Sequence, residues 1–220
     1  MTTVDAWMFS VLPGAAADPA FRDVLGSDEA ERIARLGLAS DRDRAVCARV
    51  AARTVLGRRL ALPADAVPLR FGDGGPAVDD GDTSVSWSHS GDWIALAIGH
   101  RRPVGIDIEE VPARLDMGAL AELGVGSLEE FVGLEAASKA TDCAYGGAWP
   151  PDVTVRRLSA PDRYVAAVAA PGDDWNVEVH MRSPLENLGA ARAKPLSRKA
   201  PSVTLPLTPF PGREYLHVWT

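Results

Sequence analysis

Cysteine is nearly absent from this chain of 220 residues, which contains only Cys47 and Cys143. The two cysteines lack metal-ligand spacing and have no histidine close by in sequence, so a disulfide framework or a zinc site is poorly supported. Both are expected to be buried free thiols. Long apolar runs are missing too, and none reaches the roughly 20 residues that a membrane-spanning helix needs. No early segment has the pattern of a secretory leader, and we expect a cytoplasmic protein without a membrane partner.

Positive charge is also in deficit, since 30 acidic residues stand against 23 Lys and Arg, for a net charge of −7. This balance argues against a broad nucleic-acid-binding surface, which needs a basic face. The arginines nevertheless gather in one stretch, at positions 42, 44, 49, 53, 58 and 59. Such a strip on an acidic protein indicates either contact with a polyphosphate or acidic partner, or a solvated helix face.

Apolar residues make up 46% of the chain, which is enough for a substantial buried core. Alternation and helical spacing, together with Gly and Pro breaks, predict the regular elements. We expect strands at 4–12, 84–88, 93–98, 104–109, 153–158 and 164–169, and helices at 28–36, from about 41 to 60, and at 128–140. The strands at 84–88 and 93–98 should form a hairpin around Gly91-Asp92.

The second half of the chain resembles a reduced copy of the first. The runs 94–98 and 164–169 are similar in kind, which either reflects a duplication or a generic preference for β structure. After His180 the prolines at 184, 195, 201, 206, 209 and 211 prevent a long helix or a central strand. We expect this basic tail to be an irregular wrap, a solvated segment or a partner-binding arm.

Two carboxylates stand out in the expected strand Val104–Glu109. Asp107 and Glu109 are two positions apart, so both side chains leave the same face of a strand while Ile106 and Ile108 enter the core. Paired carboxylates suit Mg²⁺ when phosphate oxygens and water complete its coordination. Alternating polar residues on a half-exposed strand would give the same pattern.

Two further groups are weaker signals on their own. Ser88 and His89 lie at the end of an expected strand, where they could donate hydrogen bonds to phosphate, although a histidine in a turn is more often structural. Glu135 and Lys139 are four residues apart on the expected helix, as in an ordinary surface ion pair.

Taken together and in this order, the residues Ser88-His89-Ser90, the segment Val104–Glu109, and Glu135 with Lys139 resemble the signature of the Sfp-type 4′-phosphopantetheinyl transferases. The match covers roughly residues 30–170. The resemblance implies an α+β fold of two similar α/β subdomains related by pseudo-twofold symmetry, with coenzyme A in the cleft between them. We place these subdomains at residues 1–103 and 104–182, followed by the Pro-rich basic tail at 183–220.

The resemblance also implies roles for individual residues. Asp107, Glu109 and Glu135 would be ligands of Mg²⁺, and Glu135 and Lys139 would be catalytic. Arg44, Ser88, His89 and Lys139 would bind coenzyme A, the substrate. The partner would be an acyl or peptidyl carrier protein, and the enzyme is expected to be a monomer.

The chain departs from the family pattern at several positions. Gly74-Gly75-Pro76 stands where the family commonly has Gly-Lys-Pro, and Phe131–Glu135 stands where it has Trp-x-x-Lys-Glu. The link from Glu109 to Glu135 is also shorter than usual. These losses leave two alternatives beside a transferase: an enzyme of natural-product biosynthesis repurposed for another substrate, and a non-catalytic carrier-binding module.

Overall fold

The computed structural model describes residues 2–72, 75–112, 116–141 and 152–181, together with Ser183 and Leu185. Gly74, Cys143 and most of the expected tail lie outside these ranges, and so do the predictions made for them. Cys47 is buried and free, as expected. No helix in the described part of the chain has the length and apolarity to cross a membrane.

A four-stranded sheet organises the first half, with the strand order β4-β5-β1-β9. Its members are β1 (Thr2–Ser10), β4 (Thr83–Ser90), β5 (Trp93–His100) and β9 (Trp175–His180). The predicted hairpin of β4 and β5 is present and turns at Gly91, whose φ of +51° suits glycine. Strand β9 was not predicted: it comes from late in the chain and pairs in parallel with β1.

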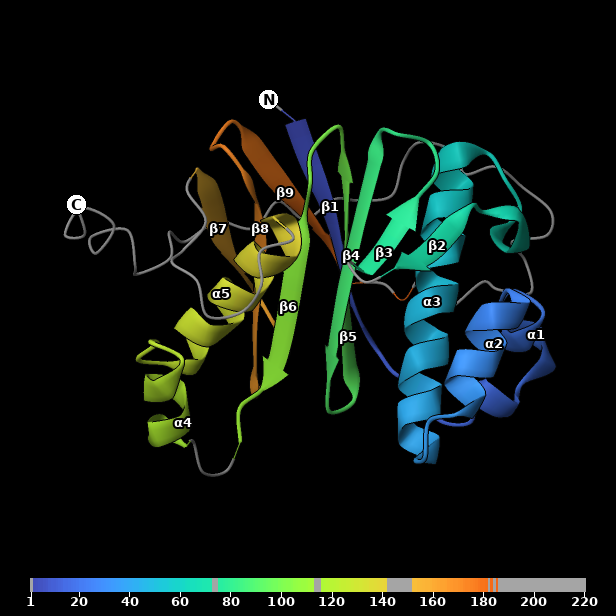
Figure 1. Cartoon of the computed structure of the whole chain (residues 1–220), viewed down its shortest axis with the longest axis horizontal. Helices are drawn as coiled ribbons and strands as arrows, with labels where there is room; N and C mark the ends of the chain where they lie inside the picture. Colours follow the sequence, from blue (N-terminus) through green and yellow to red (C-terminus); the bar gives the residue numbers. More distant parts are fainter. Residues whose placement is uncertain are drawn as a thin grey trace.

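A long helix, α3 (Ala39–Leu60), covers one face of this sheet (Figure 1). The helix is rich in Ala and Val, and its residues from Ala45 to Gly57 are buried except Arg49, so it packs almost all round. Sheet residues such as Phe9, Ile94 and Leu96 complete this core. Short elements surround α3: the 3₁₀ turns Ala15–Ala17 and Ala64–Ala66, α1 (Pro19–Arg22), α2 (Ser27–Ala34), and the small hairpin of β2 (Leu69–Gly72) and β3 (Gly75–Val78).

The second half forms a three-stranded sheet with the order β6-β8-β7. It consists of β6 (Gly105–Glu110), β7 (Val153–Leu158) and β8 (Tyr164–Pro171). Helix α5 (Leu128–Thr141) covers its outer face, and α4 (Met117–Glu122) precedes that helix. Ala136, Ala137 and Ala140 of α5 face the sheet, and Gly105 of β6 lies against this part of the helix, so helix and sheet approach closely.

The two halves repeat the same order of elements. A first strand, a helix and a hairpin follow one another as β1, α3, β4 and β5, and again as β6, α5, β7 and β8. In both sheets the second hairpin strand lies between the first hairpin strand and the leading strand. The mixed α/β fold is therefore compatible with the predicted α+β class. The pseudo-twofold symmetry itself stays a prediction.

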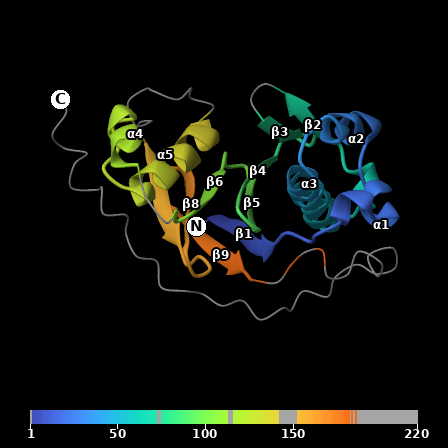
Figure 2. The ribbon, with the colours of Figure 1, turned by 90° about the horizontal axis from the view of Figure 1, so that it is seen from below.

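The two sheets pack against each other, and α3 and α5 lie on the outside (Figure 2). The shared core includes Met8 and Val179 from the first sheet and Ile106, Ile108 and Val168 from the second. Because β9 belongs to the first sheet, the hydrogen-bonded pairing crosses the predicted boundary at residue 103. The division into two subdomains remains a prediction.

A row of serines on β4 joins the two sheets. Ser84, Ser86 and Ser90 accept hydrogen bonds through Oγ from the backbone N–H groups of residues 104, 106 and 110, at 3.0–3.2 Å. The constant offset of 20 residues means that β4 and β6 run parallel. Serine hydroxyls, rather than backbone carbonyls, accept hydrogen bonds from these N–H groups. This serine seam fixes β6, and hence its carboxylates, relative to the first half.

Candidate active site

The acidic pair on β6 faces helix α5, as the alternation of the strand dictates. Ile106 and Ile108 are fully buried between the sheets, so Asp107 and Glu109 point to the opposite face. Asp107 is 2% exposed, and Glu109 is half-buried near the end of the strand. A carboxylate as buried as Asp107 requires partners that offset its loss of hydration.

Two groups supply those partners for Asp107. Ser88 Oγ donates to Asp107 Oδ1 at 2.7 Å, and Lys139 Nζ from α5 donates to the same oxygen at 2.7 Å. Burial raises the pKa of Asp107, while the charge of Lys139 and the two hydrogen bonds oppose that rise. Its second oxygen, Oδ2, is buried and has no hydrogen-bond partner among the described residues. An orphaned buried carboxylate oxygen of this kind is suited to a cation.

The other two predicted acids lie in the same neighbourhood. Ser90 Oγ donates to Glu109 Oε2 at 2.7 Å, and Glu135 Oε2 is 3.8 Å from Lys139 Nζ. Burial raises the pKa of Glu109, and the negative charges of Asp107 and Glu135 raise it further, against the hydrogen bond from Ser90. The structure therefore brings Asp107, Glu109, Glu135 and Lys139 together from β6 and α5.

Two of the acids, Asp107 and Glu135, pair with Lys139, and the three acids do not converge on a common point. The Lys139 ammonium lies between Asp107 and Glu135 and also donates to the carbonyl of Ile106 at 3.3 Å. In the described ranges, the one group of three acidic or histidine side chains whose ligand atoms all lie within 4.8 Å of one another is elsewhere, at Asp5, Glu178 and His180. Lys139 thus supplies the positive charge at the β6 site.

The predicted nucleotide-contacting residues lie at the end of β4. Arg44 from α3 donates to the carbonyl of Gly91 at 3.1 Å and forms an ion pair with Asp41. His89 is exposed, yet partial desolvation of its ring lowers its pKa, and the positive charges of Arg44 and Lys139 lower it further. Arg44, His89 and Lys139 therefore act on one another electrostatically across the two halves.

A cavity of about 480 Å³ opens beside Lys139. Its walls come from both halves: the β2–β3 hairpin, the start of β4, the approach to β6 and the end of α5. Lining residues include Arg70, Phe71, Pro76, Ser84, Val104 and Lys139. Pro76 belongs to the segment in which the family commonly has a lysine, so that segment borders the cavity.

Comparison with known proteins gives one informative similarity. The chain is similar to a phosphopantetheinyl transferase from Thraustochytrium sp., with 35% identity over 136 residues, 58% of this chain and 44% of the relative. This similarity supports membership of the phosphopantetheinyl transferase family. It does not distinguish the Sfp-type subgroup, and no family model matches the chain. The chain spans less than half the length of this curated transferase.

Ser90 also belongs to this site, although the sequence alone gave it no role. Its hydroxyl donates to the Glu109 carboxylate and accepts from the N–H of Glu110. The signal was available, because serines alternate at positions 84, 86, 88 and 90 and so share one face of a strand. What the sequence did not show is that this face meets β6.

Proposed function

We propose that the protein transfers the 4′-phosphopantetheine group of coenzyme A to a serine of an acyl or peptidyl carrier protein. The observation that carries the proposal is that Asp107 and Glu135 both pair with Lys139, which itself lines a cavity between the two halves. The similarity to a protein named phosphopantetheinyl transferase supports the same reaction.

The cavity suits the nucleotide end of coenzyme A. Its volume falls within the roughly 300–1,000 Å³ typical of small-molecule sites. Lys139 provides a cation on its wall, and Phe71 and Pro76 provide apolar surface for a base. His89 and Arg44 lie near Gly91, at the other end of β4 from the residues that line the cavity, and provide further hydrogen-bond donors there.

The donor chemistry of the acidic residues suits magnesium, although their carboxylates do not converge within ligand distance of one point in this structure. Oxygen-only donors match a hard cation, and the partnerless Oδ2 of Asp107 offers a ligand atom that nothing else in the described structure uses. Asp107, Glu109 and Glu135 would hold the ion, as we expected from the sequence. When bound, Mg²⁺ would neutralise charge on the diphosphate of coenzyme A.

Side chains of this protein would position the acidic groups, accept the proton of the carrier serine and stabilise the transferred group. Ser88 and Lys139 hold the Asp107 carboxylate in place, and Ser90 holds Glu109. Glu135 is partly exposed and can accept the proton of the carrier serine, directly or through a water. The serine oxygen then forms a bond to the β-phosphorus, and the bond to adenosine 3′,5′-bisphosphate breaks. Lys139 stabilises the charge of the transferring group by electrostatics.

Conversion of apo carrier to holo carrier tests this proposal. The purified chain is incubated with coenzyme A, MgCl₂ and several apo carrier proteins, and the mass gain of the carrier is followed by mass spectrometry. Asp107→Asn should lower the rate at least about 100-fold, because it removes a charged ligand from the metal site. Asp65→Asn, at an exposed acid in a 3₁₀ turn, is the matched control and should keep the rate.

The alternatives give different results in the same experiment. Carrier binding without a mass gain would favour a carrier-binding module, and no reaction or binding with any carrier would favour an enzyme repurposed for another substrate. Full activity of Asp107→Asn would contradict the assigned site even if the wild-type chain converts the carrier.

A further inference from the structure

Asp5 on β1 and Asp107 on β6 have comparable surroundings. Each aspartate lies on the leading strand of its repeat and faces that repeat's helix. Each aspartate forms an ion pair with a basic side chain near the end of the helix. Arg59 Nη1 is 3.6 Å from Asp5 Oδ2, and Lys139 Nζ is 2.7 Å from Asp107 Oδ1. A parallel neighbouring strand brings polar side chains to both, β9 to Asp5 and β4 to Asp107.

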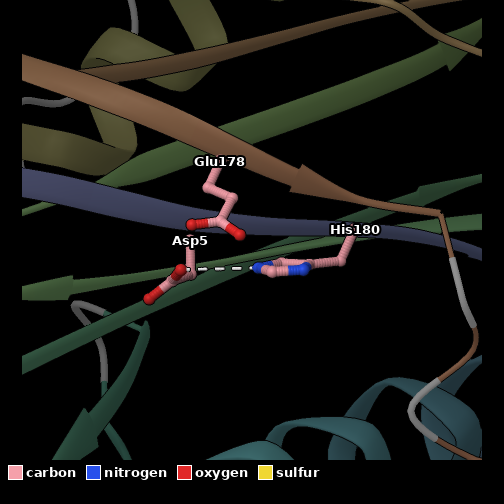
Figure 3. Close-up of side chains that lie close together, drawn as sticks. All are labelled: Asp5, Glu178 and His180. Carbon is pink, nitrogen blue, oxygen red and sulfur yellow. Dashed lines mark hydrogen bonds and ion pairs between the residues drawn. The ribbon is translucent and has the colours of Figure 1, made fainter. Parts of the chain in front are cut away.

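The polar side chains that meet Asp5 are metal-ligating types. Asp5 is the register partner of Glu178, and His180 follows two residues later on the same face of β9. Ligand atoms of the three residues all lie within 4.8 Å of one another (Figure 3). This Asp5–Glu178–His180 cluster lies on the α3 side of the first sheet, whereas the β6 acids face α5.

The histidine ring is held in an orientation that turns a nitrogen toward the carboxylates. Trp7 stacks on His180 with ring centroids 4.7 Å apart and an interplanar angle of 19°. His180 Nε2 is 3.4 Å from Asp5 Oδ1. Two ligands on a tetrahedral zinc ion, with bonds of about 2.0–2.1 Å, are separated by about 3.3–3.4 Å. The observed spacing therefore matches two ligands of one ion.

Charge in the cluster also favours a cation. Asp5 and Glu178 are neighbours on adjacent strands, and like charges in that position repel. Arg59 compensates Asp5, but Glu178 has no ion-pair partner among the described residues. Side-chain exposures of 26% for His180 and 28% for Asp5 leave the cluster open to an ion from solvent.

We propose that Asp5, Glu178 and His180 form a second metal site, selective for a divalent transition ion of the zinc type. The imidazole distinguishes it from the all-oxygen β6 site, because nitrogen ligands favour Zn²⁺ over Mg²⁺. Three protein ligands would leave a fourth position for water or another ligand. This site does not depend on the transferase activity proposed for the β6 site.

Titration calorimetry of the full chain, stripped with a chelator, tests the second site with ZnCl₂. One ion should bind per chain in the wild type, and MgCl₂ at the same concentration should not displace it. Glu178→Gln removes a ligand while keeping the Asp5–His180 contact and the Trp7 stack, and His180→Ala removes the imidazole. Each should weaken this zinc binding at least about 100-fold.

Two controls separate this site from others. His100→Ala changes an exposed histidine at the end of β5 and should leave zinc affinity unchanged. Asp107→Asn should also retain the high-affinity binding of zinc, whereas it should lower the rate of magnesium-dependent transfer at least about 100-fold. Absence of zinc binding by the wild type, or binding that both Glu178→Gln and His180→Ala leave intact, would overturn the proposal and leave an Asp–His ion pair.

Discussion

At the scale of single residues, the buried charge of Asp107 depends on the groups that contact it. Asp107 is buried with one oxygen satisfied by Ser88 and Lys139 and the other without a partner. A mutation that removed Lys139 would leave a buried charge uncompensated, so the lysine stabilises the fold as well as facing the cavity.

His89 provides a residue-scale test of these electrostatics. Desolvation and then Arg44 lower its pKa, so the ring should be neutral at pH 7 and titrate below its ordinary value of about 6.5. Because the unfolded chain binds the proton more readily, His89 reduces stability as the pH falls below that value. An NMR titration of the histidine ring signals measures the pKa.

Arg44→Gln should raise the His89 pKa toward its ordinary value, since it removes a nearby positive charge. Arg42→Gln is the matched control, because Arg42 instead donates to the carbonyls of Leu36 and Gly37. Equal pKa values in the two variants would show that Arg44 does not act on His89.

At the scale of elements, the contact of β6 with α5 positions the candidate site. Gly105 lies so close to the helix that an added Cβ would be 1.9 Å from the carbonyl oxygen of Ala136 and 2.6 Å from the amide nitrogen of Ala140. Both are backbone atoms, so the helix would have to move. Such a movement would also shift Lys139 relative to Asp107.

Gly105→Ala should therefore lower the free energy of unfolding by about 1–3 kcal/mol or more through overpacking. Urea denaturation monitored by circular dichroism measures the change. Gly37→Ala adds the same methyl where no atom lies within 4 Å, and should change stability by less than about 0.5 kcal/mol. Comparable stability of the two variants would argue against the close β6–α5 contact.

At the scale of the whole molecule, β9 connects the late part of the chain to its beginning. Trp175 starts this strand and is fully buried between the two sheets, where its indole N–H donates to the carbonyl of Gly172 and Arg156 lies 4.6 Å from its ring. Arg102 also connects the early and late parts of the chain, because it donates hydrogen bonds to Thr2, Asp174 and the carbonyl of Pro171. These contacts predict that both halves unfold together.

Differential scanning calorimetry should accordingly show one transition, with equal calorimetric and van't Hoff enthalpies. Trp175→Ala should lower the free energy of unfolding by about 3–5 kcal/mol and keep a single transition. Trp93→Ala, at a half-buried tryptophan beside the same core, should cost less. Two separate transitions in the wild type would contradict the joint core.

Local sequence determined most of the regular elements of this protein. Helix α3 was expected from about residue 41 and spans 39–60, and the hairpin of β4 and β5 was expected from alternation and Gly91-Asp92. Alternation also determined that Asp107 and Glu109 share a face. Such periodicities act over a few residues, so they can be read without knowing the fold.

Only the tertiary structure decided which segments meet. Parallel pairing of β9 with β1 joins residues about 170 positions apart, and no local pattern encodes it, so Asp5, Glu178 and His180 gave no signal as a group. The serine seam likewise appeared in the sequence as mere alternation until β6 was placed against β4. Long-range contacts depend on the packing of whole sheets, and it is this packing that makes a site from residues scattered along the chain.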